Sequence, residues 1–257
     1  MRSKISNIKK KKNKTKIVCL TAYSKTVAKI LDRYCDIILV GDSLGNVLYG
    51  MENTHNVTLD TMISHGVSVK KGIKKSLLVV DMPKNTYSNF LKAKKNAKKI
   101  MSMTKCDAVK IESNKKNYSI ISNLVKSNIP VMGHIGYTPQ YKKKFKVEGY
   151  TKNQELKLIN EAREIEKAGA FSIVLECIAS ETSKKITKLL KIPTIGIGSS
   201  KNCDGQILVT DDMLGLSGFY PRFVKKYINL SKIIVKGVQK YKKEVKRKIF
   251  PKNTNSY

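Results

Sequence analysis

Eight short apolar runs, separated by segments with helical spacing, constrain the fold of this chain more than any other feature. The runs are rich in Val, Ile and Leu and have the length of buried strands. They lie at residues 17–21, 36–40, 77–81, 107–112, 130–134, 171–176, 192–196 and 206–209. Strand and helix alternate without a long linker, which favours a single α/β domain, and eight strands in this order predict a (β/α)8 TIM barrel. An open doubly wound sheet is the structural alternative.

The segments between the runs carry apolar residues at helical spacing. In one of them four residues share a helix face, namely Leu158, Ala162, Ile165 and Gly169. Helices are also predicted at 27–34, at 90–101 and from about Leu59.

The 257 residues fit one large barrel. We expect a single domain over 1–257, with a basic segment at 1–16 and a Lys-rich tail at 240–257 that frays beyond the last helix.

The formal net charge of +32 raises the question of a polyanionic partner. Nearly all of this charge is Lys, Trp is absent and aromatic residues make up 7%. Nucleic-acid grooves instead favour Arg forks and aromatic stacking platforms. The densest Lys runs, at 9–12 and 142–144, are short. We therefore interpret the charge as solvated surface and keep a basic nucleic-acid-binding protein as the less favoured alternative.

The five cysteines form no C-x-x-C pair, so neither a disulfide framework nor a zinc ribbon is indicated. No stretch approaches the ~20 apolar residues that a membrane span needs. We expect a soluble, cytoplasmic protein with reduced thiols, no membrane partner and no specific nucleic-acid partner.

Acidic residues recur where the predicted strands end, in a chain whose bases outnumber its acids 51 to 19. They are Asp42, Asp81, Glu112 and Glu176. His134 ends the fifth run, and Lys110 precedes Glu112 by two residues and so shares its side of the strand. In a barrel these strand ends converge on one mouth, where catalytic groups of this fold lie. The pattern therefore predicts a shared site.

Three carboxylates without a His or Cys cluster suit a hard cation such as Mg²⁺. We predict Asp42, Asp81 and Glu112 as its ligands, where the metal grips a 2-oxo acid and stabilises its enolate. Glu176, among apolar neighbours, is then available as the base, since burial raises the pKa of a carboxyl group.

Each of these residues also has a purely structural interpretation. Glu176 alternatively pairs with a nearby lysine, and Lys110 alternatively pairs with Glu112. Ser43 either binds a substrate carboxylate or caps the next helix. Two further histidines, His55 and His65, are interpreted as surface or packing residues. Gly196 and Gly198 resemble only half of a phosphate-binding loop, which is weak evidence for a nucleotide.

Eight segments of the chain match the signature segments of the ketopantoate hydroxymethyltransferase family in order and spacing. They are 20–23 (Leu-Thr-Ala-Tyr), 40–45 (Val-Gly-Asp-Ser-Leu-Gly), 79–83 (Val-Val-Asp-Met-Pro), 109–112 (Val-Lys-Ile-Glu), 133–140 (Gly-His-Ile-Gly-Tyr-Thr-Pro-Gln), 174–177 (Val-Leu-Glu-Cys), 192–198 (Ile-Pro-Thr-Ile-Gly-Ile-Gly) and 203–209 (Cys-Asp-Gly-Gln-Ile-Leu-Val). The resemblance covers residues 17 to about 225.

This resemblance implies a barrel of the phosphoenolpyruvate mutase/isocitrate lyase-like superfamily, assembled as a homodecamer. It implies transfer of a hydroxymethyl group from 5,10-methylenetetrahydrofolate to 3-methyl-2-oxobutanoate in pantothenate biosynthesis, with Mg²⁺. At the matching positions, the metal ligands are Asp42, Asp81 and Glu112, and the proton acceptor is Glu176. The implied substrate-binding residues are Asp42, Ser43, Asp81, Lys110 and His134.

The sequence departs from the family pattern at several positions. Ser24, Lys84, Ser113 and Asn114 replace usual residues, and the segment 141–150 lacks a Gly-Gly element and carries Lys143 and Lys144 before Phe145. This segment resembles a lid on the folate side, so its changes are expected to stiffen it and weaken donor binding. Another Mg²⁺-dependent, enolate-forming enzyme of the same superfamily remains the enzymatic alternative, although a Lys-Lys-Cys-Gly-His segment is missing.

Overall fold

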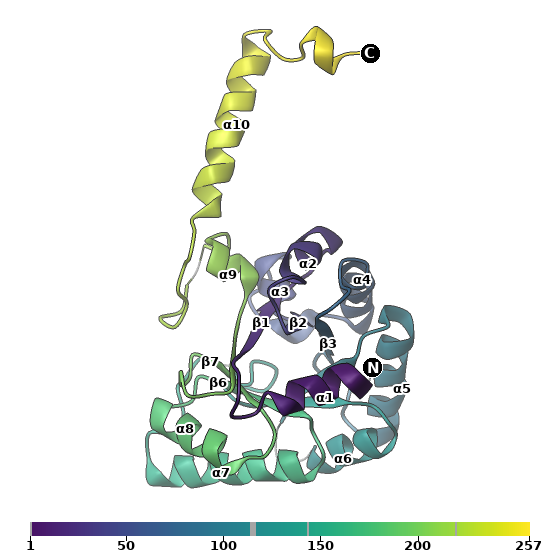
Figure 1. The fold of residues 1–257 in the computed structure, drawn as a ribbon, viewed down its shortest axis with the longest axis vertical. Helices are drawn as coiled ribbons and strands as arrows, with labels where there is room; N and C mark the ends of the chain where they lie inside the picture. Colours follow the sequence, from purple (N-terminus) through teal and green to yellow (C-terminus); the bar gives the residue numbers. More distant parts are fainter. Residues whose placement is uncertain (1, 114–116, 143, 219) are drawn as a thin grey trace. The chain divides into compact units, whose positions relative to one another are not determined.

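The computed structural model describes residues 2–113, 117–142, 144–218 and 220–257 and shows a closed barrel of eight strands in chain order (Figure 1). All neighbouring strands are parallel. The strands are β1 (Ile17–Thr21), β2 (Ile37–Val40), β3 (Leu77–Asp81), β4 (Ala108–Glu112), β5 (Val131–Gly136), β6 (Ser172–Glu176), β7 (Thr194–Ile197) and β8 (Gly205–Leu208). The predicted barrel and its eight strands are confirmed, and the open sheet is wrong.

Helices follow or precede the strands around the barrel (Figure 1). They are α1 (Arg2–Lys10), α2 (Lys25–Leu31), α3 (Leu44–Val47), α4 (Leu59–Lys70), α5 (Phe90–Thr104), α6 (Tyr118–Lys126), α7 (Lys152–Lys167) and α8 (Ser180–Leu189), with a 3-10 turn at Thr54–Asn56. Four of these helices have an N-cap residue whose side chain accepts a hydrogen bond from a backbone amide of the first turn. These residues are Ser24, Thr58, Asn89 and Thr151.

One residue of the predicted helix face lies outside its helix. Gly169 follows the end of α7 with φ of 92°, a left-handed conformation that glycine adopts without strain. A Cβ atom there would lie 3.0 Å from Cγ1 of Val125. Gly169 therefore ends the helix, because backbone conformation and close packing both favour a residue without a side chain.

Strands β2 to β5 bury every residue, and β6 and β7 all but their last, which explains why their sequences are largely apolar, whereas Val18 of β1 and Gln206 of β8 are exposed. One set of alternate residues forms a cluster with the helices, for example Ile38, Val80 and Ile111. The other set forms a second, separate cluster inside the barrel, which includes Ile37, Leu39, Leu77, Val79, Ala108, Met132, Val174, Ile195 and Ile207. The period of two thus assigns the buried strand residues either to the helices or to the barrel interior.

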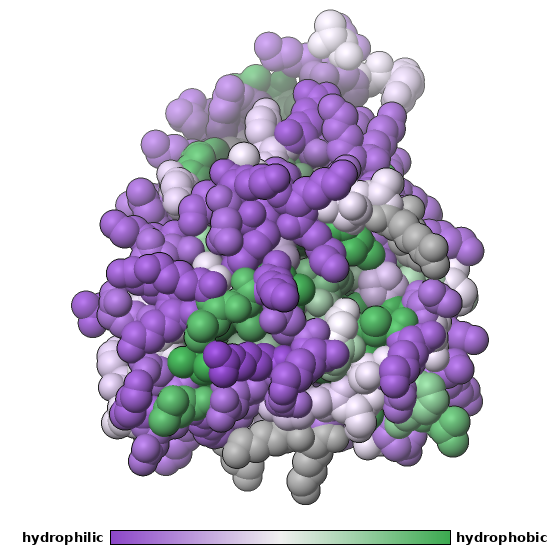
Figure 2. Space-filling view, turned by 60° about the horizontal axis from the view of Figure 1, so that its bottom comes forward, coloured by the Kyte–Doolittle hydropathy of each residue, from purple (hydrophilic) through white to green (hydrophobic). Residues whose placement is uncertain are grey.

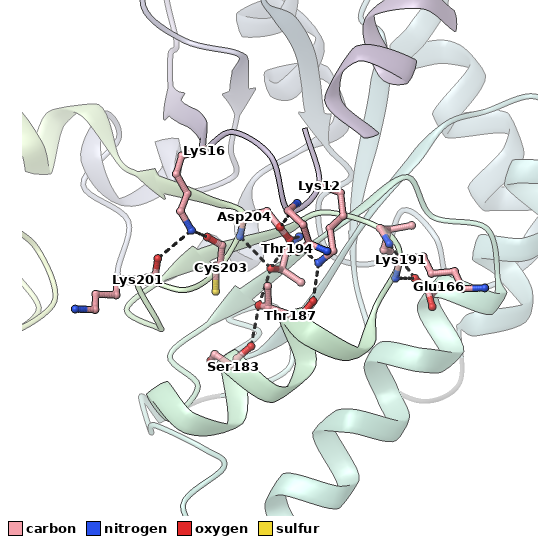
Figure 3. A network of polar contacts seen from close by, with 12 residues as sticks. Lys12, Lys16, Glu166, Ser183, Thr187, Lys191, Thr194, Lys201, Cys203 and Asp204 are labelled. Atoms are coloured by element: carbon pink, nitrogen blue, oxygen red, sulfur yellow. Dashed lines mark hydrogen bonds and ion pairs between the residues drawn. The ribbon is translucent and has the colours of Figure 1, made fainter. Parts of the chain in front are cut away.

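The N-terminal segment belongs to the barrel unit. Ile8 of α1 is buried in the interior cluster, and the Lys12 ammonium donates to Oδ2 of Asp204 at 2.8 Å and to the Thr187 carbonyl oxygen at 2.6 Å (Figure 3). The same Asp204 oxygen accepts from the Thr194 amide at 2.8 Å. Because Thr194 begins β7 and Asp204 precedes β8, this network lies at the amino-terminal ends of the strands.

The chain divides into two compact units, Met1–Val209 and Thr210–Tyr257. The second contains α9 (Thr210–Leu214), α10 (Leu230–Lys246) and a 3-10 turn at Asn253–Asn255. The Lys-rich tail predicted at 240–257 is helical as far as Lys246. Its Lys residues are compatible with the helix because their side chains remain in solvent.

The surface and the cysteines can also be compared with what the sequence predicts. On the face drawn in Figure 2, hydrophilic residues cover most of the surface and hydrophobic residues show in separate patches. All five cysteines are buried and unpaired. No helix in the described ranges is both long and apolar enough to cross a bilayer.

Candidate active site

The predicted site residues form a polar layer at the carboxyl ends of β2 to β6. Along β3, Asp81 follows Leu77 and Val79 at steps of two, and along β4, Lys110 and Glu112 follow Ala108 in the same way. The inward-facing residues of these strands are therefore apolar near the amino end of the strand and charged at its carboxyl end. Strand register pairs Asp81 with Lys110 and Glu112 with His134.

An ion pair joins two of these strands. The Lys110 ammonium lies 3.1 Å from Oδ1 of Asp81, and both side chains are buried. The other Asp81 oxygen accepts from the Asp42 backbone amide at 3.1 Å, which anchors the start of the loop after β2. Lys110 is thus paired, but with Asp81 rather than with Glu112, because β3 and β4 register these two positions side by side.

Glu176 meets the same cluster through His134. Nε2 of His134 lies 3.1 Å from Oε2 of Glu176, while its Nδ1 lies 3.4 Å from the Lys110 ammonium and 3.7 Å from Oε1 of Glu112. Glu176 keeps 18% of its side chain exposed, the largest fraction among these four residues. Among the described contacts, Glu176 thus pairs with His134.

Two residues that sequence reasoning assigned no role complete the site. Gln140 is fully buried, and its side-chain amide donates to Oδ2 of Asp42 at 2.8 Å, while its backbone amide donates to Oε2 of Glu112 at 3.0 Å. The Tyr87 hydroxyl donates to the Gln140 side-chain oxygen. Gln140 ends the matched segment 133–140, which was the available signal for it, whereas Tyr87 lies outside every matched segment.

Burial controls the pKa values of this cluster. Burial raises the pKa of Glu176 to about 7 and that of Asp81 to about 7, although Lys110 opposes both shifts. Burial also raises the pKa of Glu112 well above its usual range, and the charge of Asp42 adds to this effect.

The basic residues respond in the opposite sense to burial. Burial lowers the pKa of His134 well below its usual range, and the charge of Lys110 lowers it further, so the ring is neutral at pH 7. Burial also lowers the pKa of Lys110, but Asp81 and Glu112 outweigh it and raise that pKa. The site thus holds one cation against four carboxyl groups.

This surplus of carboxyl groups fits a divalent cation. Oε1 of Glu112 is buried without a hydrogen-bond partner, and Oδ1 of Asp81 is held by its ion pair with Lys110 and by no hydrogen bond, so both oxygens suit a hard cation. In the described part of the chain, no group of three or more His, Cys, Asp or Glu side chains is arranged so that it alone could hold a metal ion. Mg²⁺ does not require one, because it keeps several waters in its coordination shell.

The remaining predicted positions have clear partners. The Ser43 hydroxyl lies 2.9 Å from the Tyr23 hydroxyl, and Ser43 occupies the cap position of α3 without a side-chain capping bond. His55 contacts the Pro139 carbonyl oxygen, and His65 contacts the Tyr23 carbonyl oxygen. The interpretation of both histidines as surface or packing residues stays a prediction.

The segment 141–150 is attached to the mouth of the barrel at several points. Lys142 donates to the Gly136 carbonyl oxygen at 2.6 Å, and Glu148 exchanges backbone hydrogen bonds with the chain after β6 at Cys177 and Ala179. The ring of Phe145 packs edge-on against Tyr137. Lys143 of this segment, like Asn114 after β4, lies outside the described residues. The attachment beside Glu176 makes this segment a candidate cover for the site.

Comparison with known proteins identifies the family. The family model described as ketopantoate hydroxymethyltransferase matches residues 2–253. The chain belongs to the ketopantoate hydroxymethyltransferase family. Its predicted family membership and its prediction as a hydroxymethyltransferase are confirmed, and the alternatives are not favoured.

Individual proteins with similar sequences support the assignment of this chain to the family. A 3-methyl-2-oxobutanoate hydroxymethyltransferase of Pelagibacter ubique (strain HTCC1062) is 55% identical over 257 residues, which cover 100% of both chains. The enzyme of that name from Thermotoga maritima (strain ATCC 43589 / DSM 3109 / JCM 10099 / NBRC 100826 / MSB8) is 46% identical, with 98% of this chain and 96% of the relative covered.

Solved structures confirm the predicted fold. A 2,3-dimethylmalate lyase, described as a PEP mutase/isocitrate lyase superfamily member, aligns with a TM-score of 0.63 at 12% identity over 95% of this chain and 88% of the other. A phosphonopyruvate hydrolase in complex with oxalate and Mg²⁺ aligns with a TM-score of 0.62 at 12% identity, covering 98% of this chain and 93% of the other. This chain thus shares its barrel fold with that lyase and that hydrolase.

Proposed function

We propose that this chain transfers a hydroxymethyl group from 5,10-methylenetetrahydrofolate to 3-methyl-2-oxobutanoate and forms ketopantoate for pantothenate biosynthesis. The observation that carries the proposal is the buried cluster at the barrel mouth, where Glu176 faces Lys110 and three further carboxyl groups across His134. The one-carbon unit arrives as a methylene group. One water is therefore consumed, and its oxygen becomes the new hydroxyl group.

Asp42, Asp81 and Glu112 would hold Mg²⁺, which supplies Lewis-acid polarisation of the 2-oxo carbonyl when it is bound. The buried Oε1 of Glu112, which has no hydrogen-bond partner, supports this assignment. A phosphonopyruvate hydrolase of the same fold is described with oxalate and Mg²⁺, which supports the same class of metal.

Glu176 is the proposed base. With its pKa raised to about 7 by burial, its ionised form removes the proton from C3 of the oxo acid near neutral pH. Two bonds then replace the two carbon–nitrogen bonds that hold the one-carbon unit on folate, namely a carbon–carbon bond from C3 and a carbon–oxygen bond from water. The proton from C3 and one proton of the water balance the two folate nitrogens. Lys110 stabilises the developing negative charge on the substrate. Ser43 contacts the substrate carboxylate through its hydroxyl or backbone N–H, and His134 lies near the new hydroxyl.

Deuterium exchange separates the two halves of this reaction. In deuterated buffer with Mg²⁺, NMR should show exchange at C3 of 3-methyl-2-oxobutanoate, and EDTA should stop it. Addition of 5,10-methylenetetrahydrofolate should then yield ketopantoate. Exchange without product would mean that the altered segment 141–150 has lost the donor, and absence of exchange would overturn the proposed substrate.

Assembly as a homodecamer in the cytoplasm is part of the same proposal. Helix α10 supports self-association because it buries none of its residues and presents an apolar stripe at helical spacing, formed by Ile234, Val238, Tyr241 and Val245. Analytical ultracentrifugation tests it, and a monomer at micromolar concentration would contradict it. That residues 1–257 act as one domain stays a prediction.

A further inference from the structure

Gln140 sits where two of the proposed metal ligands meet, although it is not a ligand itself. It lies in the loop after β5, and its amides reach side chains from the ends of β2 and β4. One oxygen of Asp42 and one oxygen of Glu112 are held in this way. The second oxygen of Glu112 is left buried and without a hydrogen-bond partner.

The orientation of the Gln140 side chain is determined by its neighbours. Its nitrogen lies 3.0 Å from the Met82 carbonyl oxygen, which only accepts hydrogen bonds, so the NH₂ group must face Met82 and Asp42. The side-chain oxygen then faces the Tyr87 hydroxyl, which donates to it. Every polar atom of the side chain therefore has a partner that agrees with a single orientation.

A neutral donor suits a metal site better than a lysine would. Gln140 stabilises the ionised carboxylates by hydrogen bonding without adding a positive charge that competes with the cation. Holding one oxygen of each carboxylate also fixes the direction of the other oxygen. Partners of this kind commonly change metal affinity when they are lost.

We propose that Gln140, oriented by Tyr87, is a positioning residue that presents Asp42 and Glu112 to the divalent cation and thereby sets its affinity. This inference rests on the proposed function, because it requires the metal at that site. It adds a residue from the loop that leads into segment 141–150, so the order of that loop and the affinity for the cation are linked through the Gln140 backbone.

Metal affinity of the EDTA-treated full chain tests the proposal by calorimetry with Mn²⁺. Gln140→Met retains the side-chain length and the backbone amide but loses both side-chain donations, and we expect Kd to rise at least about tenfold. Tyr87→Phe, which releases only the amide orientation, should raise Kd at least about threefold. Activity of both variants should recover when Mg²⁺ is raised, whereas a damaged fold would not recover.

Thr187→Val is the matched control, because it removes a buried hydroxyl that bonds Ser183 and Thr194 at the opposite end of the barrel. It should leave the Mn²⁺ Kd within twofold of the parent. A folded Gln140→Met variant with a Kd within twofold of the parent would overturn the proposal. If that variant does not fold, Tyr87→Phe decides, and a rise of less than threefold overturns it. A parent chain that binds no Mn²⁺ would instead overturn the metal part of the proposed function.

Discussion

Nε2 of His134 lies 3.1 Å from Oε2 of Glu176, and the opposite ring nitrogen lies 3.4 Å from the Lys110 ammonium. An ammonium has only donors, so Nδ1 must accept its hydrogen bond. The neutral ring therefore carries its proton on Nε2, facing Glu176. The base, the imidazole and the ammonium form a continuous polar path across three strands, in which Glu176 is the member that reaches the open mouth.

Glu176→Gln should remove proton abstraction while leaving the cluster in place. The amide has nearly the same shape but cannot accept a proton, so C3 exchange should fall by roughly 10²–10⁴-fold. Binding of Mn²⁺ should be unchanged, because Glu176 is not a proposed ligand. NMR exchange and calorimetry on the same preparation check both. Exchange at the parent rate would rule out Glu176 as the base.

The pH dependence of exchange follows from the same residue. Burial raises the pKa of Glu176 to about 7, and the base works only when it is ionised. The exchange rate at saturating Mg²⁺ should therefore rise nearly tenfold per pH unit well below about pH 7 and level off above it. Initial rates between about pH 5.5 and 8.5 test this rise. A flat profile across that range would contradict it.

The barrel and its polar layer were predictable because parallel strands have a simple sequence signature. Runs that are apolar on both faces and end in an acid at Asp81, Glu112 or Glu176 identify buried strands and the mouth of the barrel together. Which side chains pair was not predictable. The Lys110–Asp81 ion pair depends on the register between β3 and β4, which the spacing within either strand does not contain.

Contacts made by loops could not be predicted from the sequence either. Gln140 reaches Asp42, 98 residues away, because the loop after β5 folds across the mouth. Tyr87, 53 residues from Gln140, belongs to no regular pattern. Period and propensity predict elements and their faces, but a fully satisfied amide inside a loop follows only from the assembled fold.

Asp81→Asn and Asp81→Ala should separate catalysis from stability. Both remove a proposed metal carboxylate, so both should abolish turnover and weaken Mn²⁺ binding. Only the alanine variant removes the oxygen that pairs with the buried Lys110 ammonium, which should lower the free energy of unfolding by about 3–5 kcal/mol. Asparagine retains an oxygen toward Lys110 and should cost less. Urea unfolding and turnover assays measure the two effects, and near-parent activity of either variant would remove the metal assignment of Asp81.

The polar network at the amino-terminal ends of the strands gives a stability prediction that is independent of catalysis. Lys12 and Asp204 keep 9% and 4% of their side chains exposed, and Asp204 also holds the first residue of β7 (Figure 3). Lys12→Met leaves a buried carboxylate without its cation, so the free energy of unfolding should fall by about 3–5 kcal/mol. Lys99→Met is the matched control, because its pair with Asp60 is solvent-exposed at 48% and 79% and should contribute at most about 1 kcal/mol.

Urea unfolding measures both changes. Mn²⁺ affinity should stay at the parent value in each folded variant, since the proposed metal ligands lie at the opposite ends of the strands. An equal loss of stability in the two variants would show that the Lys12–Asp204 pair behaves like a surface contact.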